Sequence, residues 1–483
     1  MTRHPLFIDG AFTASARTRE IRAPWSGEVI AEVDEADASQ MEQAISAASH
    51  AFPTLRAVSR YMRSRLLAEM ASELEARRAD LVASIVNEAG KPSTLADGEV
   101  TRAIATFTIG AEEAKRYGGE LCPVDLDPGG RAYDLAQTFF TPRGPVLAIT
   151  PFNFPLNLVA HKVVPALAVG APVLIKPAPQ TPGAARILAE IFAAARERVG
   201  DARESIPPAA LQVVSAPNEV ASLAVTDPRM AVVSFTGSAE VGWNLQAMAR
   251  GKRVVLELGG NASVIVHDDA DLARAAARAA FGAFAYAGQV CISVQNLWVQ
   301  AQVYERFKAL FLAEVGKIAW GDPRVTGTLG GPLIDGRAAD RLMRWIDEAR
   351  QGGARVLAGG TRDGNTLTPT VIEGAPPSSD IVCEEAFGPV AVLTPYGSID
   401  EAIGRVNGSR YGLQAGVFTE SLSVVRRAVE GLEVGAVLIN EVPTYRADHL
   451  PYGGVKSSGL GREGVRYAME EYSERKTVVM WRG

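Results

Sequence analysis

The sequence predicts an α/β protein with two doubly wound parallel-sheet domains and a small β arm. From residue 144 onward, short apolar segments alternate with helical segments, which is the pattern of doubly wound sheets. The predicted strands are nearly all apolar, as expected where helices cover both faces of a sheet. A chain of 483 residues is also long enough for two or three domains.

The first part of the chain is predicted to be helical. Apolar periodicity predicts helices at 38–50, 57–86 and 96–117. Residues 122–142 then resemble a β-hairpin around Pro128-Gly129-Gly130.

Two α/β series follow. In the first, strands are predicted at 144–149, 172–175, 211–214, 230–235 and 253–258, and helices at 155–169, 182–198, 218–225 and 239–250. In the second, strands are predicted at 263–266, 296–299, 355–357, 390–394, 415–418 and 436–439, and helices at 270–287, 303–317, 337–352, 399–406 and 421–430. The apolar tail, 476–481, is a predicted strand that needs a partner. Another subunit and the chain's own hairpin fit equally well.

Composition narrows the class of protein. The net charge of −6, with acidic and basic residues mixed, argues against a nucleic-acid binder. Three cysteines give no disulfide framework and fit a reducing compartment. The start of the chain lacks a signal-peptide core, and the longest apolar stretch, 155–175, contains His161 and Lys162. We therefore expect a cytoplasmic protein without membrane spans, and the five histidines show no metal-ligand spacing.

Cys291 and Glu257 are the most informative residues. Cys291 follows Gly288, which lets backbone or ligand come close. Glu257 ends an apolar strand, where a carboxylate is costly to bury unless it is paired or functional. A thiol nucleophile needs a base to resolve its covalent intermediate. An ion pair with an arginine is the alternative for Glu257.

Asn153 follows a strand, where its amide could donate to a developing oxyanion or could cap a helix. If Pro155 begins a helix, Asn157 and His161 share one face of that helix, which points roughly the same way as Asn153. A polar stripe on an otherwise apolar helix predicts a wet cavity, and a surface stripe is the alternative.

Two further segments fit phosphate or ribose binding. Lys176 closes a strand, the end at which parallel sheets bind ligands, although it could also be a surface lysine. Residues 234–242 link a strand to a helix, with Gly237 and Ser238 at the junction. Backbone N–H groups there could hold a phosphate, or the segment could be a simple cap. The spacing is not the Gly-x-Gly-x-x-Gly fingerprint.

Together these segments resemble the aldehyde dehydrogenase superfamily. The resemblance covers nearly the whole chain, in order: Phe7 to Gly10, Pro151 to Pro155, Lys176-Pro177, Phe235 to Ser238, Glu257 to Gly260, Gly288 to Cys291, Glu385 to Pro389 and Pro451 to Gly459. The closest-looking branches are lactaldehyde, non-phosphorylating glyceraldehyde-3-phosphate and phosphonoacetaldehyde dehydrogenases.

The resemblance implies a domain arrangement. Residues 1–121 and 143–258 would form the dinucleotide-binding domain and 259–460 the catalytic domain. Residues 122–142 and 461–483 would form an oligomerisation arm, which implies a homodimer or homotetramer.

It also implies roles for individual residues. Cys291 would attack an aldehyde, Asn153 would stabilise the oxyanion, and Glu257 would activate water to hydrolyse the thioester. The cofactor, NAD or NADP, would be held by Ile149, Thr150, Phe152, Lys176, Pro179, Gly237, Ser238, Val241, Leu258, Glu385 and Phe387. The substrate would meet Arg102, Phe154, Asn157, His161, Tyr445, Arg446 and Tyr452.

Three departures from the family pattern affect specificity. Pro179 stands where many NAD-preferring members have a glutamate, so no carboxylate there repels the 2′-phosphate of NADP. Asn157 and His161 are polar at positions that are often apolar or aromatic in members that act on greasy aldehydes. The loop 440–451 contains Arg446, which together with Arg102 could hold an anion bidentately, or both could form surface ion pairs. Val290 offers no cation beside the nucleophile.

The sequence therefore predicts an NAD(P)-dependent hydrolytic dehydrogenase for a small polar or anionic aldehyde. A CoA-acylating semialdehyde dehydrogenase is the nearest alternative, and Glu257 argues against it. A non-catalytic protein on the same scaffold and a cofactor-free thiol esterase are further alternatives.

Overall fold

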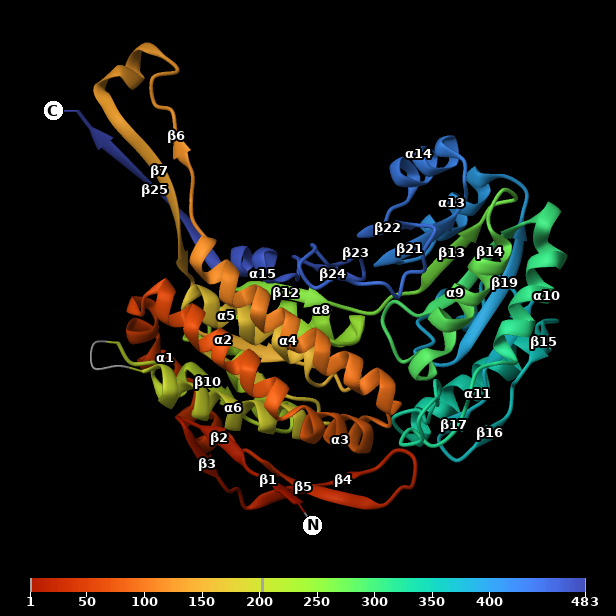
Figure 1. Cartoon of the computed structure of the whole chain (residues 1–483), viewed down its shortest axis with the longest axis horizontal. Helices are drawn as coiled ribbons and strands as arrows, with labels where there is room; N and C mark the ends of the chain where they lie inside the picture. Colours follow the sequence, from red (N-terminus) through yellow and green to blue (C-terminus); the bar gives the residue numbers. More distant parts are fainter. Residues whose placement is uncertain (1, 201–203, 483) are drawn as a thin grey trace.

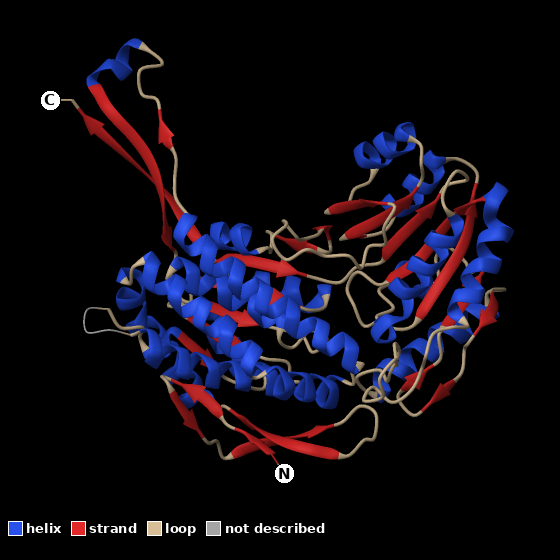
Figure 2. Ribbon diagram, viewed as in Figure 1, coloured by secondary structure: helices blue, strands red, loops and turns tan. Residues whose placement is uncertain are grey.

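The computed structural model describes residues 2–200 and 204–482. Two lobes, each built on a sheet with helices on both faces, lie side by side, and a β arm projects from the first (Figures 1 and 2). The predicted fold class is confirmed. None of the helices in these ranges is both long and apolar enough to cross a bilayer.

The first lobe contains an eight-stranded sheet in the order β24-β12-β11-β8-β9-β10-β2-β3. Its strands are β2 (Leu6–Ile8), β3 (Ala11–Thr13), β8 (Val146–Ile149), β9 (Val173–Lys176), β10 (Leu211–Val213), β11 (Val232–Thr236), β12 (Arg253–Glu257) and β24 (Gly459–Leu460). The five central strands, β8 to β12, are parallel to one another. The outer three, β24, β2 and β3, each pair antiparallel with the neighbouring strand. The strand order reverses at β8, which places a ligand-binding switch point at the carboxyl ends of β8 and β11.

Helices surround this sheet. They are α1 (Ala38–Ala57), α2 (Arg60–Ala76), α3 (Arg78–Ala89), α4 (Ser93–Arg116), α5 (Asn157–Val169), α6 (Gly183–Val199), α7 (Asn218–Thr226), α8 (Ala239–Met248) and α15 (Val465–Glu471), with a 3₁₀ turn η2 (Pro208–Ala210). The single helix predicted at 57–86 is wrong. Ser59 caps α2 by accepting from Met62 N at 3.1 Å, and a break at Arg77 separates α2 from α3.

The second lobe contains a seven-stranded sheet in the order β15-β18-β19-β14-β13-β21-β22. Its strands are β13 (Ala262–Val266), β14 (Val294–Gln300), β15 (Arg355–Ala358), β18 (Thr370–Glu373), β19 (Val390–Tyr396), β21 (Gln414–Phe418) and β22 (Ala436–Ile439). Its helices are α9 (Leu272–Phe284), α10 (Tyr304–Val315), α11 (Gly336–Gln351), α12 (Asp380–Cys383), α13 (Ile399–Asn407) and α14 (Leu422–Gly431), with the 3₁₀ turns η3 (Ala285–Gly288) and η4 (Ala301–Val303).

Four small sheets, one of them in the arm, complete the fold. One joins β1 (Thr2–His4), β5 (Val29–Glu35) and β4 (Arg17–Arg22) at the N-terminal edge, and two pairs join β16 (Arg362–Asp363) to β17 (Thr366–Leu367) and β20 (Tyr411–Gly412) to β23 (Val455–Lys456). The arm consists of β6 (Leu121–Cys122), η1 (Pro128–Ala132), β7 (Tyr133–Pro142) and β25 (Ser473–Trp481).

The C-terminal segment is divided between body and arm. β25 pairs antiparallel with β7, so the tail docks on the chain's own hairpin, one of the two partners open from the sequence. Helix α15 instead packs on α4 and α5, and β24 pairs with β12. Within the described residues 461–482, only those of β25 therefore join the sheet of the arm.

Candidate active site

Cys291 lies in a tight turn that leads into β14. Tyr286, Ala287 and Gly288 have left-handed backbone (φ 53°, 52° and 65°), which ends the helical run at Phe284 and not at 287 as predicted. A Cβ on Gly288 would lie 2.2 Å from the carbonyl oxygen of Gly388, so this position requires glycine. The next residue, Gln289, is fully buried, donates to Pro332 O at 3.1 Å and accepts from Ile334 N at 2.8 Å. The turn before the thiol is therefore fixed.

Asn153 reaches this turn from the end of β8. Its Nδ2 donates to the carbonyl oxygen of Gln289 at 2.9 Å. An amide nitrogen has two hydrogens, so the second remains for an oxygen near the thiol. Asn153 does not cap a helix, because α5 begins only at Asn157 with Leu156 as its cap residue.

Glu257, at the end of β12, lies beside the same turn. Its side chain is buried, neither carboxylate oxygen accepts a hydrogen bond, and it forms no ion pair among the described residues, so the predicted alternative of an arginine partner is wrong. A Cβ on Gly453 would lie 2.7 Å from Oε1. Burial, and then the charge of Glu463, raises the pKa of Glu257 well above its ordinary value.

Tyr452 connects the Glu257 region to the nucleophile. Its Oη lies 3.2 Å from Cys291 Sγ, and a Cβ on the adjacent Gly453 would lie 2.7 Å from Glu257 Oε1. Burial raises the pKa of the Cys291 thiol to about 12, and the Tyr452 hydrogen bond opposes that rise. The structure thus brings the thiol, the amide and the carboxylate together from three distant segments.

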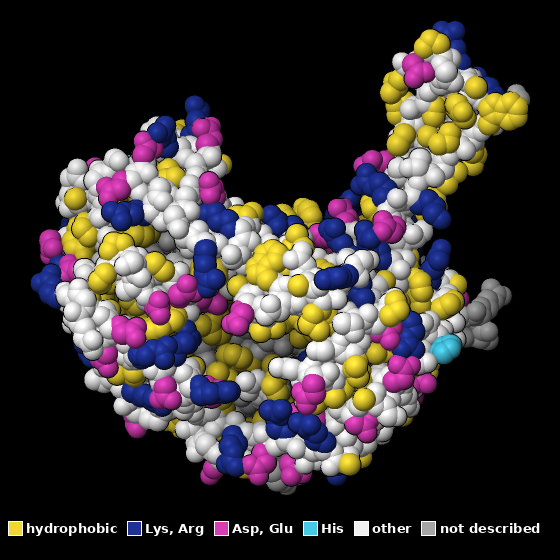
Figure 3. Space-filling view, turned by 180° about the vertical axis from the view of Figure 1, so that it is seen from behind, with side chains coloured by type: hydrophobic (Ala, Val, Ile, Leu, Met, Phe, Trp, Pro, Cys, Tyr) yellow, Lys and Arg dark blue, Asp and Glu magenta, His cyan; other side chains and the backbone are white. Residues whose placement is uncertain are grey.

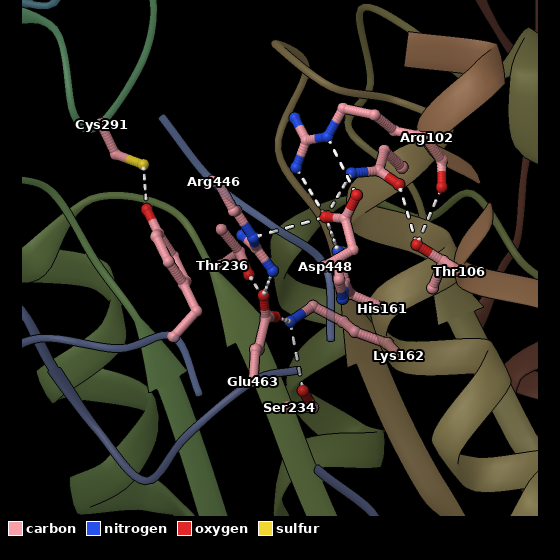
Figure 4. Close-up of polar contacts among 12 residues, drawn as sticks. Arg102, Thr106, His161, Lys162, Ser234, Thr236, Cys291, Arg446, Asp448 and Glu463 are labelled. Atoms are coloured by element: carbon pink, nitrogen blue, oxygen red, sulfur yellow. Dashed lines mark hydrogen bonds and ion pairs between the residues drawn. The ribbon is translucent and has the colours of Figure 1, made fainter. Parts of the chain in front are cut away.

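A second group of polar side chains surrounds Asp448 (Figure 4). Arg102 donates to both carboxylate oxygens, at 3.0 and 2.6 Å, and His161 Nε2 lies 2.8 Å from Oδ1. Asn157 Nδ2 is 3.5 Å and Arg446 Nε 3.6 Å from the same oxygen. Asn157 and His161 do share a face, but this face is buried against Asp448, so the surface-stripe alternative is wrong. Arg102 is ion-paired, as the alternative predicted, but its partner is a buried carboxylate.

Arg446 links the two groups. Its guanidinium carbon lies 3.8 Å from the ring centre of Tyr452, and its Nη2 donates to Glu463 Oε2 at 3.1 Å. The side chain is only 7% exposed, and its Nε has no hydrogen-bond partner in the described parts of the chain. Although burial opposes the charge, Glu463 and Asp448 raise the pKa of Arg446, so it stays a cation.

Lys162 and Glu463 complete the site and were not predicted. Lys162 Nζ lies 2.9 Å from Glu463 Oε1 and donates to Ser234 Oγ at 3.1 Å. Burial alone would raise the pKa of Glu463, but Lys162 and Arg446 hold it at about 2. A lysine within the apolar helix α5 is a usable signal, since a buried lysine needs a partner. The partner lies 301 residues away and could not be identified from the sequence.

Protonation states follow from these contacts. Burial, then the charge of Arg446, lowers the pKa of His161, and the hydrogen bond from His161 and the charge of Arg102 hold the pKa of Asp448 well below its usual range despite burial. A neutral His161 therefore donates from Nε2 to an ionised Asp448. Its Nδ1 has no partner among the described residues.

Several predicted cofactor residues gather at the switch point of the first sheet. Ile149 ends β8 and Thr150 follows it, Lys176 ends β9, and Gly237 and Ser238 join β11 to α8. Ser238 is the cap residue of α8 but its side chain makes no cap bond, and Thr150 Oγ1 is buried without a partner. Lys176 is buried, which excludes a surface lysine, and burial lowers its pKa. Free first-turn N–H groups, a lysine and an orphan hydroxyl fit a dinucleotide.

The remaining predicted cofactor residues are divided between the two lobes. Glu385 Oε1 accepts from Gly260 N at 3.1 Å, and burial raises the pKa of Glu385 to about 7. The ring centres of Phe387 and Phe152 are 5.8 Å apart, in an edge-to-face arrangement. Leu258 fills the space beside Gly242, Val241 is exposed on α8, and Pro179 is half-buried after β9.

Two predicted substrate residues behave differently from each other. Phe154 lies under Lys91, whose Nζ is 3.5 Å from its ring centre, and its ring is 5.9 Å from the guanidinium of Arg102. Tyr445 is more than half exposed, and its side chain makes no hydrogen bond within 2–200 and 204–482. The structure therefore brings Phe154, but not Tyr445, to the Asp448 group.

One surface cluster of potential metal ligands has no spacing pattern in the sequence, because its residues are consecutive. His267, Asp268 and Asp269 place potential metal-ligand atoms within 4.8 Å of one another. Exposed carboxylates commonly gather in this way without binding an ion.

Comparison with known proteins agrees with this arrangement. The pattern of the aldehyde dehydrogenase family matches residues 12–478. The chain is 38% identical over 479 residues to a 3-sulfolactaldehyde dehydrogenase of Priestia megaterium, covering 99% of this chain and 98% of that protein.

Two solved structures are closely similar. One is aldehyde dehydrogenase 21 from Physcomitrella patens in complex with the reaction product succinate, with a TM-score of 0.95, 39% identity and coverage of 99% and 98%. The other is NADP-dependent glyceraldehyde-3-phosphate dehydrogenase from Bacillus halodurans complexed with NADP, with a TM-score of 0.95, 33% identity and full coverage of both chains (100% each). The chain therefore belongs to the aldehyde dehydrogenase family, the NAD(P)-dependent enzymes that its sequence resembles.

Proposed function

We propose that this enzyme oxidises a small aldehyde with one anionic group to the corresponding carboxylate by a hydrolytic route. The observation that carries the proposal is the pair of arginines, Arg102 and Arg446, around Asp448. This pair lies beside Tyr452, the residue that contacts the Cys291 thiol. The buried Nε of Arg446 lies 3.6 Å from Asp448 Oδ1 but has no hydrogen-bond partner among the described residues, which is costly unless a ligand supplies one.

Charge favours a monoanion. Arg102, Arg446 and Lys162 are cations, whereas Asp448 and Glu463 are carboxylates. The raised pKa of Glu257 favours its neutral form. One positive charge is therefore left for the substrate, which suits a carboxylate or sulfonate better than a phosphate dianion. The anionic compounds in the names of the Priestia and Physcomitrella proteins support this choice.

In the proposed reaction, the Cys291 thiolate attacks the aldehyde carbon, and the free N–H of Asn153 holds the resulting oxyanion. The bound nicotinamide supplies the hydride acceptor. A thioester on Cys291 remains, and Glu257, once ionised, takes a proton from water as it attacks the thioester carbon. Cys291 then leaves as a thiolate and the carboxylate product is released. Lys176, Ser238 and Glu385 would bind and orient the cofactor.

A panel of aldehydes tests the proposal. Sulfolactaldehyde, succinic semialdehyde, glyceraldehyde-3-phosphate, lactaldehyde and propanal are assayed with NAD and with NADP, each with and without CoA. We expect kcat/KM to be highest for a monoanionic aldehyde and independent of CoA. A preference for propanal contradicts the anion site, and CoA-dependent turnover favours the acylating alternative.

Arg102 is the cleaner of the two arginines to change, because it does not contact the residues around the thiol. Losing a hydrogen bond to a charged group weakens binding by roughly 1.5–3 kcal/mol, so Arg102→Gln should raise KM for the anionic aldehyde about 10- to 100-fold and leave propanal unaffected. Arg427→Gln is the matched control, since Arg427 forms a similar bidentate pair with Asp400 on the surface. Equal KM changes for charged and neutral aldehydes would argue against anion recognition.

A further inference from the structure

The nearest hydrogen-bonding group to the nucleophile is a tyrosine hydroxyl. Tyr452 Oη, 3.2 Å from Cys291 Sγ, makes the one side-chain hydrogen bond of that sulfur among the described residues. The tyrosine is 5% exposed and packs with Ile292 and Leu413. We propose that Tyr452 is a catalytic residue whose hydroxyl donates a hydrogen bond to the Cys291 thiolate, and that Arg446 strengthens this donor. The inference rests on the proposed role of Cys291 as nucleophile.

A hydroxyl suits both states of the sulfur. In the resting thiol, S–H can donate to Oη, since a hydroxyl accepts as well as donates. When the thiol proton passes to water or to an ionised Glu257, the O–H rotates and donates to the anionic sulfur. Tyr452 itself loses no proton, because burial raises its pKa well above the ordinary value.

Arg446 provides the cation that the sequence beside Cys291 lacks. The neighbour Val290 is apolar. Arg446, 155 positions after Cys291, stacks on the face of Tyr452, with its guanidinium carbon 3.8 Å from the ring centre. A cation over the ring favours negative charge on the phenol oxygen and makes its O–H a better donor. Glu463 and Asp448 hold the guanidinium in place from the other side (Figure 4).

Burial of the thiol makes this stabilisation necessary. A thiol buried away from charges keeps its proton and reacts slowly. Among the contacts in the structure, the Tyr452 hydrogen bond is the largest influence that lowers the pKa of Cys291, and Arg446 is the next. Both come from the segment 446–452, so this loop activates the nucleophile as well as facing the proposed anion site.

The test measures thiol reactivity without aldehyde or cofactor. In a background with Cys122→Ser and Cys383→Ser, iodoacetamide alkylates only Cys291. Losing a hydrogen bond to the thiolate raises its pKa by about one to two units. The thiolate fraction falls accordingly, and higher intrinsic nucleophilicity recovers part of the loss. Tyr452→Phe should therefore slow alkylation at pH 8 roughly 3- to 10-fold.

Tyr304→Phe is the matched control, because it removes another phenol hydroxyl bond, to Glu373, elsewhere in the second lobe. Its alkylation rate should equal that of the parent. Arg446→Gln should also slow alkylation, and it serves as the second probe if Tyr452→Phe does not fold. An unchanged or faster rate in either folded variant overturns the proposal.

The outcomes separate this inference from the proposed function. If alkylation is unchanged in Tyr452→Phe while Cys291→Ala abolishes aldehyde oxidation, the reaction stands and the role of Tyr452 does not. If alkylation slows but none of the aldehydes is oxidised, Tyr452 stabilises the thiolate and the proposed reaction is wrong.

Discussion

At the scale of single residues, the site is marked by buried polar atoms without partners. Five such atoms have no hydrogen-bond partner among the described residues: Thr150 Oγ1, Asn153 Oδ1, Arg446 Nε and both oxygens of Glu257. Each such atom costs free energy of folding, roughly 1–3 kcal/mol. Such atoms also occur elsewhere in the described residues, but these five lie around the proposed reaction centre, where a ligand could satisfy them.

Glu257→Gln should separate thioester formation from hydrolysis. We expect a rapid burst of NAD(P)H followed by slow turnover, with an acid-trapped acyl adduct on Cys291 visible by mass spectrometry. Glu430→Gln, on the exposed part of α14, is the control and should behave as wild type. An unchanged steady state in Glu257→Gln would exclude the general-base role.

The pH dependence has a defined sign. Only ionised Glu257 is a base and burial raises its pKa, so the hydrolysis rate of the wild type should rise with pH and that of Glu257→Gln should not. Folding favours the protonated carboxyl, so above about pH 4.5, the ordinary value, the folded state loses stability relative to the unfolded state as pH rises. Glu257→Gln removes that loss, which thermal unfolding at pH 6 and pH 9 would show.

At the scale of elements, the sequence predicted the parts that have a local signal. The parallel strands are mostly apolar, so β8, β9, β11 and β12 could be located without a structure. Strand β4 could not, because only Ile21 of its six residues is buried and there is no alternation to detect. The Asp448 group could not be predicted either, because Arg102 and Asp448 are 346 residues apart and their contact depends on how the lobes meet.

Gly288→Ala should be more damaging than its backbone angle alone explains. Gly288 and Gly364 both have left-handed backbone, at φ +65° and +55°, but only Gly288 has a carbonyl in the way of a Cβ. We expect Gly364→Ala to cost about 1–2 kcal/mol and Gly288→Ala more, together with a loss of kcat because Cys291 shifts. Thermal unfolding and steady-state assays measure both effects. Equal destabilisation of the two variants would show that the contact with Gly388 relaxes freely.

At the scale of the whole molecule, the arm is the part that exposes a group of large apolar side chains. Hydrophobic side chains gather on it (Figure 3), including Leu121, Tyr133 and Trp481, which are 74%, 41% and 71% exposed. An exposed apolar strand invites pairing with another chain. We therefore expect a homodimer or homotetramer assembled through the arm.

Charges on the arm should dissociate the oligomer. Val479 and Trp481 are both exposed apolar side chains of β25. The double variant Val479→Glu/Trp481→Glu should sediment as a monomer, because like charges would be buried at the interface. Leu422→Glu, at an 84% exposed position on α14, is the control and should sediment as wild type. Persistence of the oligomer in the double variant would place the interface elsewhere.

The contact between Cys291 and Tyr452 lies where the two lobes meet, and Tyr452 packs with Ile292 and Leu413 of the second lobe. Cys291 precedes a strand of the second sheet, whereas Tyr452 bridges to Glu463, which is held by Lys162 on a helix of the first. A hinge motion that parts the lobes would strain either this contact or the bridge from Tyr452 to Glu463. Sulfur reactivity would then report, in real time and without an added fluorophore, whether the enzyme is open or closed.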